Sequence, residues 1–406
     1  MKFAELVSAV EEFSRKGSDT LIIMPFYLEY GWLSDHLGAL SKQTFQDFDV
    51  ILILNKVSDE TKVYEIIRKG KPRFGIIVAK RKEDTGSAGG FFTGQRYALE
   101  NGYKQMIIVD IDCIPIDNDL VEMLVRNKDR GYVKPTVRIT DAGRVVQTMA
   151  GGVIPWYSLI SMDTARKYGL YYLPLYYGAE DLDYASRIKE KPFVIGSKCQ
   201  HPAPSIQSYK NLDKSLIYMV NGLAVIRDLR ALPIYVVTLI VSMPAYLVFF
   251  PAYGSKAFNA LLSCLLTHTY GKRASERLVS GFGGHVQGKA PDGFEHVDYS
   301  SSLSLDKQYF LMPLRIMKDT FRRNIVIDHS KSGFLATFVP IFAKKSYYWI
   351  ENRGHLLLSD NSNPVLHAVK LLLFAALLPI IAVFIIFYVV PMNLILRPKT
   401  DNYGLD

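Results

Sequence analysis

The chain has 406 residues, which is enough for two domains or for one domain and a membrane region. Hydrophobic residues make up 49% of it and charged residues only 21%, a balance that predicts a large core or a segment within a bilayer. The formal charge of +9 favours an anionic partner, either phosphate groups or a lipid surface, whereas dispersed basic residues without zinc-finger spacing argue against nucleic acid. Three widely separated cysteines argue against a disulfide framework and for a reducing compartment.

Helical and strand patterns alternate from the N-terminus onward. Residues 1–17 mix apolar residues with glutamates and predict an amphipathic surface helix rather than a signal peptide. Short apolar runs then alternate with stretches of helical periodicity, which predicts a mostly parallel sheet with right-handed crossovers. The expected strands are Thr20–Met24, Asp49–Leu54 and Arg73–Ala79, and the expected helices are Trp32–Lys42, Asp59–Lys69 and Gly86–Asn101.

The next apolar run, Met106–Val109, ends in two aspartates, Asp110 and Asp112. An uninterrupted run rich in β-branched residues is typical of a strand buried on both faces of a parallel sheet. Ligands of open α/β sheets bind at the carboxyl ends of the strands, and residues i and i+2 share a side, so both carboxylates can face one ligand. The pair suits Mg²⁺ or Mn²⁺ carrying a phosphorylated substrate. A solvated acidic turn is the simpler alternative.

Three further motifs each allow a functional and a plain structural interpretation. The glycine-rich run at 85–90 begins a helix, where free N–H groups favour phosphate, but it also fits a flexible turn and lacks the lysine of a Walker A loop. The acidic residues at 180–183, with Arg187 one turn later, crowd a helix start, where they can also simply complement the helix dipole. His201 is a lone histidine in a proline-rich loop without the partners of a structural zinc site.

Taken together, residues 18–210 resemble the inverting, nucleotide-sugar-dependent glycosyltransferases of family 2, which have the GT-A fold. The glycine run is similar to that of the rhamnosyl- and galactofuranosyl-transferase branches, with Asp84 in place of their Asn. The other motifs, in the family's order, are Pro25-Phe-Tyr-Leu-Glu29, Asn55-Lys-Val-Ser58-Asp59 with one residue missing before the final acid, Asp110-Ile-Asp112, and Glu180-Asp181-Leu-Asp183 with Arg187.

The resemblance implies a role for each matching residue. A cation held by Asp110, Asp112 and His201 would neutralise the leaving diphosphate, and Asp181 would act as the base for the acceptor hydroxyl, with Glu180 shaping the site. Trp156 and its neighbour Tyr157 are candidates for stacking on a sugar. The residues expected to bind the donor nucleotide are Pro25, Tyr27, Glu29, Asn55, Ser58, Asp84, Gly86, Gly89, Gly90 and Asp110, and those expected to bind the acceptor are Gly151, Gly152, Trp156, Asp183 and Arg187.

The C-terminal half has membrane character. The stretch at 229–268 is apolar but short and interrupted by proline, so both a membrane span and a re-entrant hairpin fit it. The basic region at 269–364 contains two stretches that predict interfacial helices, Tyr309–Arg323 and Val339–Trp349. Lys370 is the only charge in the apolar run at 369–390, and basic anchors follow it. The expected order is thus a GT-A domain at 18–228, the hydrophobic segment, the basic region, a transmembrane helix at 365–392 and a cytoplasmic tail at 393–406.

The sequence therefore predicts an α/β GT-A domain, with a Rossmann-like, mostly parallel sheet, followed by an α-helical membrane-associated region. We expect a metal-dependent, membrane-anchored glycosyltransferase of the hexosyltransferase type, acting on the cytoplasmic side of the cell membrane. Its donor would be a UDP-, GDP- or dTDP-sugar, and its acceptor a polyprenyl- or glycolipid-linked saccharide. Absence of the Gln-x-x-Arg-Trp motif of processive synthases favours single transfers.

Two alternatives stay open at this point. One is a polyprenyl-phosphate hexosyltransferase that resembles dolichol-phosphate-sugar synthases, although such enzymes normally lack the glycine-rich element. The other is a catalytically inactive membrane scaffold of the same fold, which the intact acidic motifs disfavour. The sequence also leaves open Mg²⁺ against Mn²⁺, the number of membrane crossings and whether the chain forms a homo-oligomer.

Overall fold

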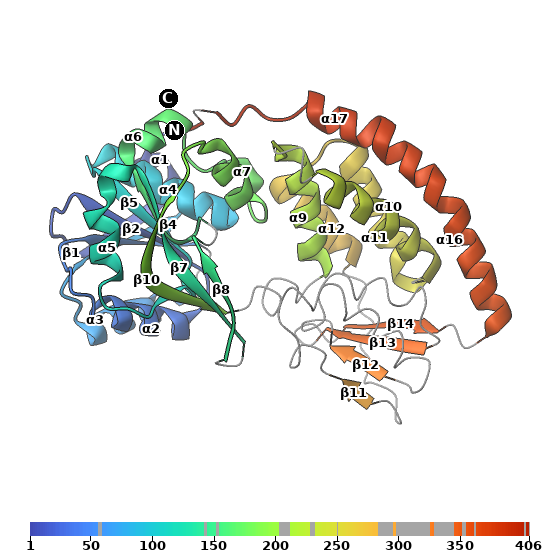
Figure 1. Cartoon of the computed structure of the whole chain (residues 1–406), viewed down its shortest axis with the longest axis horizontal. Helices are drawn as coiled ribbons and strands as arrows, with labels where there is room; N and C mark the ends of the chain where they lie inside the picture. The colour runs from blue at the N-terminus through green and yellow to red at the C-terminus, as the bar shows by residue number, and fades with distance from the viewer. Residues whose placement is uncertain are drawn as a thin grey trace. The chain divides into compact units, whose positions relative to one another are not determined.

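The computed structural model of the chain describes residues 1–55, 59–141, 144–151, 154–202, 212–227, 232–249, 251–282, 295–297, 325–328, 345–350, 355–360, 363–401 and 403–405. The chain divides into two compact units (Figure 1). Unit 1 consists of Met1–Pro202 together with the C-terminal tail, Lys399–Asp406, and unit 2 consists of Ala203–Pro398. The first boundary between the units therefore falls after Pro202, whereas the sequence analysis placed the end of the GT-A domain at residue 228.

Unit 1 is built on a ten-stranded mixed sheet in the order β1-β4-β3-β2-β5-β9-β7-β10-β6, with β8 paired to β7. The four strands from β4 to β5 are parallel to one another, and the antiparallel β9 joins them to the second half of the sheet. The strands are β1 Val7–Ser14, β2 Thr20–Phe26, β3 Asp49–Leu54, β4 Gly75–Arg81, β5 Gln105–Val109, β6 Ile114–Pro115, β7 Tyr132–Asp141, β8 Arg144–Ala150, β9 Trp156–Ser161 and β10 Phe193–Pro202.

Helices connect these strands and pack on the sheet. All side chains of β3 and β5 are buried, as expected for strands covered on both faces. Gly94 of α4 faces Ile23 of β2 so closely that a Cβ atom would lie 2.2 Å from the Ile23 Cγ2 atom, which explains a glycine inside this helix. The helices are α1 Phe3–Leu6, α2 Tyr30–Leu40, α3 Glu60–Gly70, α4 Gly86–Glu100, α5 Leu120–Arg126, α6 Met162–Tyr168 and α7 Glu180–Arg187, with short 3₁₀ turns at Lys128–Arg130 and Leu173–Leu175.

The structure confirms the predicted alternation of strands and helices between Thr20 and Val109, with bounds within two residues of the expected ones. The prediction of an N-terminal amphipathic helix is wrong. After the four-residue α1, the segment Val7–Ser14 forms strand β1, which pairs antiparallel with β4. Pairing satisfies the backbone N–H and C=O groups along the edge of β4, and this tertiary demand outweighs the local helical pattern.

The described part of unit 2 contains helices and a small sheet. The helix α10 packs against α11 and α16, and the four-stranded sheet has the order β11-β12-β13-β14. The interfacial helix expected at 339–349 is contradicted, because the second half of that segment belongs to strand β13. The other expected interfacial helix, at 309–323, lies outside the described residues. The elements are α9 Leu212–Val225, α10 Leu232–Phe249, α11 Pro251–Leu266, α12 Gly271–Phe282, β11 Glu295–Val297, β12 Ile325–Asp328, β13 Lys345–Ile350, β14 His355–Asp360, α16 Pro364–Phe384, a π-helical turn at Ile385–Val389 and α17 Val390–Ile395.

Among the described residues, one helical stretch is long and apolar enough to cross a membrane, judged by length and composition. It runs from Pro364 to Ile395, has 32 residues and a mean hydropathy of 2.9, and includes the predicted span at 365–392. The hydrophobic segment expected at 229–268 forms two helices, α10 and α11, with Pro244 inside the first.

Candidate active site

The sheet brings three possible metal ligands together. Asp110 and Asp112 follow β5, and His201 lies near the end of β10. One ligand atom from each lies within 4.8 Å of the others, and the His201 Nε2 atom is 3.2 Å from the Asp112 Oδ1 atom. The expectation that His201 sits in a loop is wrong, since β10 pairs in parallel with β7 through this residue. The structure thus brings the three expected ligands together.

The donor set fits a divalent cation. The His201 Nδ1 atom donates a hydrogen bond to the Pro202 carbonyl oxygen, so Nε2 is the ring nitrogen that faces Asp112, in an ion pair when the ring is protonated and with a lone pair when it is neutral. A lone pair facing a carboxylate repels it unless a cation lies between them. Two carboxylates and one imidazole are ligands that Mn²⁺ accepts, and Mg²⁺ prefers the oxygens. Trp156 stacks on the His201 ring, with 4.5 Å between ring centroids, and restricts the ring's orientation.

Negative charge accumulates around Asp110. Burial raises the pKa of Asp110 well above its usual range, and the nearby charges of Asp112, Glu180, Asp181 and Glu29 raise it further. Five carboxyl groups from three segments of the chain thus lie close enough to affect one another. Adjacent like charges are stable together only if protons or a cation neutralise them, so the electrostatics favour the same cation that the ligand geometry favours.

A buried histidine that the sequence analysis missed supports the Asp-x-Asp loop. The His36 Nδ1 atom is 2.9 Å from the Ile111 carbonyl oxygen, between the two aspartates, and its Nε2 atom is hydrogen bonded to the Tyr157 hydroxyl. Burial lowers the pKa of His36 to about 4, so the ring is neutral. Tyr157 has a φ of 62°, an unusual conformation for a tyrosine that typically needs support from neighbours. The predicted sugar-stacking role of Tyr157 is not available to its buried ring, which instead supports this loop.

The acidic motif begins helix α7, as the sequence predicted. Ala179, which precedes the helix, has a φ of 69°, and this left-handed turn directs Glu180 and Asp181 toward the site. Ser87 of α4 donates a hydrogen bond to Glu180, whose pKa is raised to about 7 by burial and by Asp181. Burial also raises the pKa of Asp181, while the Leu182 N–H group at 2.8 Å and the buried Lys134 favour its charged form.

Several of the expected donor residues line one network. Asn55 Nδ2 donates to the Gly86 carbonyl oxygen at 2.8 Å, and the Gly86 N–H group donates to Asp84 Oδ1 at 3.1 Å. Gly86 has a φ of 63°, and a Cβ atom there would lie 2.1 Å from the Tyr176 carbonyl oxygen, so only glycine fits this turn. The Tyr176 hydroxyl donates to Asp84. The network ties the end of β3 to the start of α4.

The remaining expected donor residues fall into two groups. Tyr27 and Glu29 follow β2 and are exposed. Gly89 and Gly90 are buried inside α4, and Gly90 packs on Pro25, which makes them spacers between helix and sheet rather than a phosphate-lining backbone. Ser58 lies outside the described residues.

The acceptor set is only partly exposed to a ligand. Asp183 and Arg187 form an ion pair at 2.9 Å with no exposed side-chain surface, so burial favours a structural role over direct acceptor contact. Trp156 is buried against His201, and Gly151 has a φ of 76° and lies beside Lys134. Gly152 lies outside the described residues. Acceptor binding by these residues stays a prediction.

We expect Asp112→Asn to weaken the binding of Mn²⁺ alone by at least about tenfold, because it replaces one charged ligand by a neutral one. Electron paramagnetic resonance of free Mn²⁺ titrated with the full-length protein in detergent measures this. Asp35→Asn, an exposed aspartate on α2, is the matched control and should bind Mn²⁺ as the unmodified protein does. Equal affinities for all three proteins would show that the cation site lies elsewhere.

In the presence of a chelator, Glu180 should make the folded protein less stable as pH rises from about 4.5 to about 7. Its folded pKa of about 7 is above its ordinary value of 4.5, so the folded state holds the proton more tightly and loses this advantage on deprotonation. The difference corresponds to at most about 3 kcal/mol.

Thermal unfolding over this pH range measures the effect, and Glu180→Gln should flatten the pH dependence. Glu65→Gln, on the exposed side of α3, should leave the profile of the unmodified protein unchanged. Parallel profiles for all three proteins would contradict the assignment of a shifted proton to Glu180.

The chain is similar to known proteins over part of its sequence and part of its structure. The sequence profile of Glycosyl transferase family 2 matches residues 21–178, from β2 to the turn before α7. No curated protein sequence matches the chain. Among solved structures, it is similar to mannosyltransferase PcManGT from Pyrobaculum calidifontis in complex with GDP-Man and Mn2+, at 16% identity and a TM-score of 0.41, covering 68% of this chain and 83% of that chain.

Two other solved structures show comparable similarity. S. aureus TarS 1-349 in complex with UDP has 12% identity and a TM-score of 0.38, over 70% of this chain and 97% of that chain. A mycobacterial protein has 13% identity and a TM-score of 0.35, over 52% of this chain and 75% of that chain. The profile match covers the strands that carry the Asp-x-Asp pair. Residues 21–178 belong to glycosyl transferase family 2, and the chain is a glycosyltransferase.

Proposed function

We propose that this glycosyltransferase is anchored in a membrane, inverts the anomeric centre, and moves a sugar from a nucleotide-sugar donor to a lipid-linked saccharide with the help of a divalent cation. The observation that carries the proposal is the convergence of Asp110, Asp112 and His201 with Glu180 and Asp181 around one site. The family profile ends at residue 178, so the roles of Asp181 and His201 rest on this convergence.

The site separates the tasks that glycosyl transfer requires. Asp110, Asp112 and His201 would hold the cation, which when bound supplies positive charge for the departing diphosphate. Asp181 would accept the proton of the acceptor hydroxyl, and its burial makes it a better base than an exposed aspartate. Lys134 would keep Asp181 ionised before the acceptor arrives. Attack from the side opposite the diphosphate would invert the sugar.

Membrane anchoring is supported by the apolar helix Pro364–Ile395. The tail that follows it is part of unit 1, so the Ile395 end of a spanning helix and the glycosyltransferase unit would share one side of the membrane. Pro364 would then lie on the other side, and the chain between Pro202 and Pro364 would cross the membrane an odd number of times. The apolar helix α10 suits one such crossing. A lipid-linked acceptor would place the reacting hydroxyl near this membrane surface.

Calorimetric binding of UDP, GDP and dTDP to the detergent-purified full-length protein, with and without Mn²⁺, tests the donor part of the proposal. We expect one nucleotide to bind in a Mn²⁺-dependent way and Asp112→Ala to abolish that binding. Transfer assays with polyprenyl phosphate and with polyprenyl-linked saccharides then distinguish the two kinds of acceptor. A protein that binds none of the nucleotides under either condition would be a scaffold and not the enzyme proposed here.

Asp181→Asn should reduce transfer by at least about 100-fold and leave nucleotide affinity within about twofold, because the base acts only on the acceptor. Turnover is measured with the donor identified by calorimetry, and nucleotide affinity is measured by calorimetry again. Asp163→Asn, at an exposed position on α6, is the control and should leave both quantities unchanged. An equal loss of nucleotide binding in Asp181→Asn would assign Asp181 to the donor and refute its role as base.

A further inference from the structure

We propose that the C-terminal tail, Lys399–Asp406, is a working part of the glycosyltransferase unit and that Thr400 positions helix α7 through Asp183. The inference rests on the proposed function in one respect, namely that Asp181 on α7 is the base. Thr400 is a positioning residue in this proposal because it contacts Asp183 and not the reacting groups.

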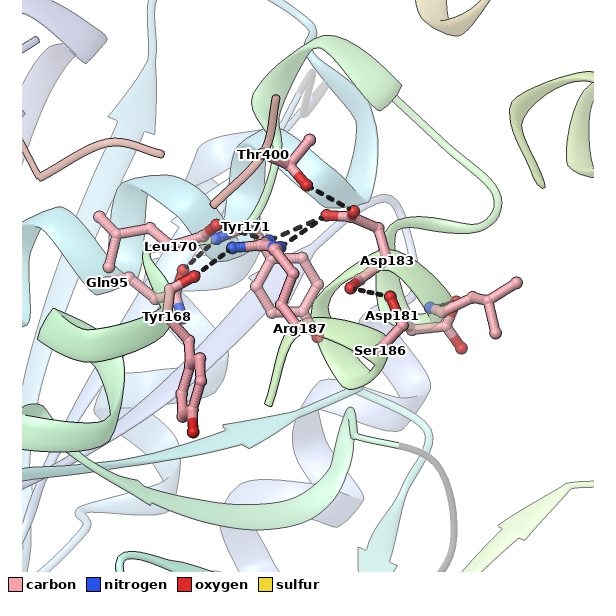
Figure 2. A network of polar contacts seen from close by, with 10 residues as sticks. Gln95, Tyr168, Leu170, Tyr171, Asp181, Asp183, Ser186, Arg187 and Thr400 are labelled. Carbon is pink, nitrogen blue, oxygen red and sulfur yellow. Dashed lines mark hydrogen bonds and ion pairs between the residues drawn. The ribbon is translucent and has the colours of Figure 1, made fainter. Parts of the chain in front are cut away.

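The contact is direct and buried. The Thr400 Oγ1 atom donates a hydrogen bond to the Asp183 Oδ1 atom at 2.9 Å, across 217 positions of the sequence. Both residues are only 1% exposed. Figure 2 shows Thr400 approaching Asp183 from the side opposite Ser186, with the dashed line between hydroxyl and carboxylate. A buried carboxylate that loses a charge-assisted hydrogen bond is strongly penalised, so this bond is more than a surface contact.

Asp183 also connects Thr400 to Arg187. The second carboxylate oxygen of Asp183 accepts a hydrogen bond from Arg187 Nε at 3.0 Å and forms an ion pair with Arg187 Nη2 at 2.9 Å. Arg187 in turn donates to the carbonyl oxygens of Tyr168 and Leu170, each at 2.7 Å (Figure 2). Helix α7 is thus fixed at its C-terminal end to the segment after α6 and, in its first turn, to the tail. The tail supplies one of the partners of the buried Asp183 carboxylate.

The tail is itself held at several points and is not a loose end. The Leu170 N–H group donates to the Tyr403 carbonyl oxygen at 2.8 Å, and Arg96 donates to the Gly404 carbonyl oxygen at 2.8 Å. The Tyr403 ring packs edge-on against Tyr172, with 4.9 Å between centroids. Tyr403 and Leu405 also pack on the core of unit 1. Leu170 contributes its carbonyl oxygen to Arg187 and its N–H group to the tail, so the two networks are one.

The position of Asp181 depends on this network. Asp181 lies two residues before Asp183, in the first turn of an eight-residue helix that starts from the left-handed residue Ala179. A short helix with a strained start has few contacts of its own to fix it. Without the Thr400 hydroxyl, α7 would lose one of the bonds that fix the turn carrying the base. Of the cation ligands, Asp110 and Asp112 follow β5 and His201 lies in β10, away from α7 in sequence, so we expect a change at Thr400 to affect the acceptor side selectively.

Thr400→Val tests the proposal because valine keeps the shape of threonine and removes the hydroxyl. We expect kcat to fall by about 10- to 100-fold, as small displacements of a catalytic group can produce. The affinities for Mn²⁺ alone and for the nucleotide should stay within about twofold. Thr400→Ser, which restores a hydroxyl, should recover most of the activity. Hydrogen exchange of the α7 amides should accelerate in Thr400→Val and not in Thr400→Ser.

Thr44→Val is the matched control, since the exposed Thr44 also donates a hydrogen bond to a carboxylate, that of Glu122, away from α7. It should change neither kcat nor exchange in α7. The proposal is overturned if Thr400→Val keeps kcat within twofold and normal exchange in α7, if Thr400→Ser is equally impaired, or if Thr400→Val loses nucleotide binding to the same extent as activity. Accelerated exchange at α7 in a protein whose unmodified form transfers no sugar would refute the proposed function and leave the positioning contact standing.

Discussion

The crowding of carboxylates at the carboxyl edge of the sheet is the constraint on which the rest of unit 1 depends. Asp110, Asp112, Glu180 and Asp181 come from two distant segments and still act on one another electrostatically. Two like charges 4 Å apart repel by about 4 kcal/mol at an effective dielectric constant of 20. A fold keeps such an arrangement only if a positive ligand compensates the repulsion or if protons neutralise the groups. Without a cation, the raised pKa values of Asp110 and Glu180 favour neutralisation by protons. His201 beside Asp112 provides a further ligand for a cation that would neutralise the site instead.

Strained backbone surrounds this acidic site. Leu28, Tyr157, Tyr176 and Ala179 have positive φ angles, and residues of this kind typically cost about 1–3 kcal/mol each. Each is close in sequence to a functional segment, either the turn after β2, the strand β9 beside Asp110, or the turn before α7. Buried contacts compensate the strain, as in the hydrogen bond between His36 and Tyr157. Unfavourable backbone conformations thus occur next to the site, where side-chain direction matters, and buried contacts offset their cost.

The fold from Thr20 to Val109 could be predicted because local patterns and tertiary structure agree there. Strands β3 and β5 are apolar on both faces, and the helices between them have clear periodicity and turn residues. The Asp-x-Asp pair could be found for the same reason, since it directly follows such a strand. His201 was placed in the right cluster by resemblance alone, because neighbouring prolines hide the strand β10 from local reasoning. His36 looks like any buried residue of a helix until Ile111 and Tyr157 are seen beside it. The strand β1 was missed because its pairing partner, β4, lies about 70 residues away.

The docking of the tail was the least predictable feature of unit 1, since nothing local in Lys399–Asp406 indicates which residues it contacts. Sequence patterns reveal elements in which buried residues recur at a regular spacing. The tail docks through a few backbone carbonyl groups, one tyrosine ring and one hydroxyl, so its buried residues show no such spacing. The position of the tail in the chain is informative, because only four residues separate Thr400 from the end of the apolar helix at Ile395. Any force that shifts the end of this helix must act on the tail through that short connection. Under the proposed function, in which the acceptor is linked to a lipid, the base has to stay at a fixed distance from the membrane surface. The hydrogen bond from Thr400 to Asp183 would then connect the tail, which follows the proposed membrane anchor, to α7, the helix that carries the proposed base.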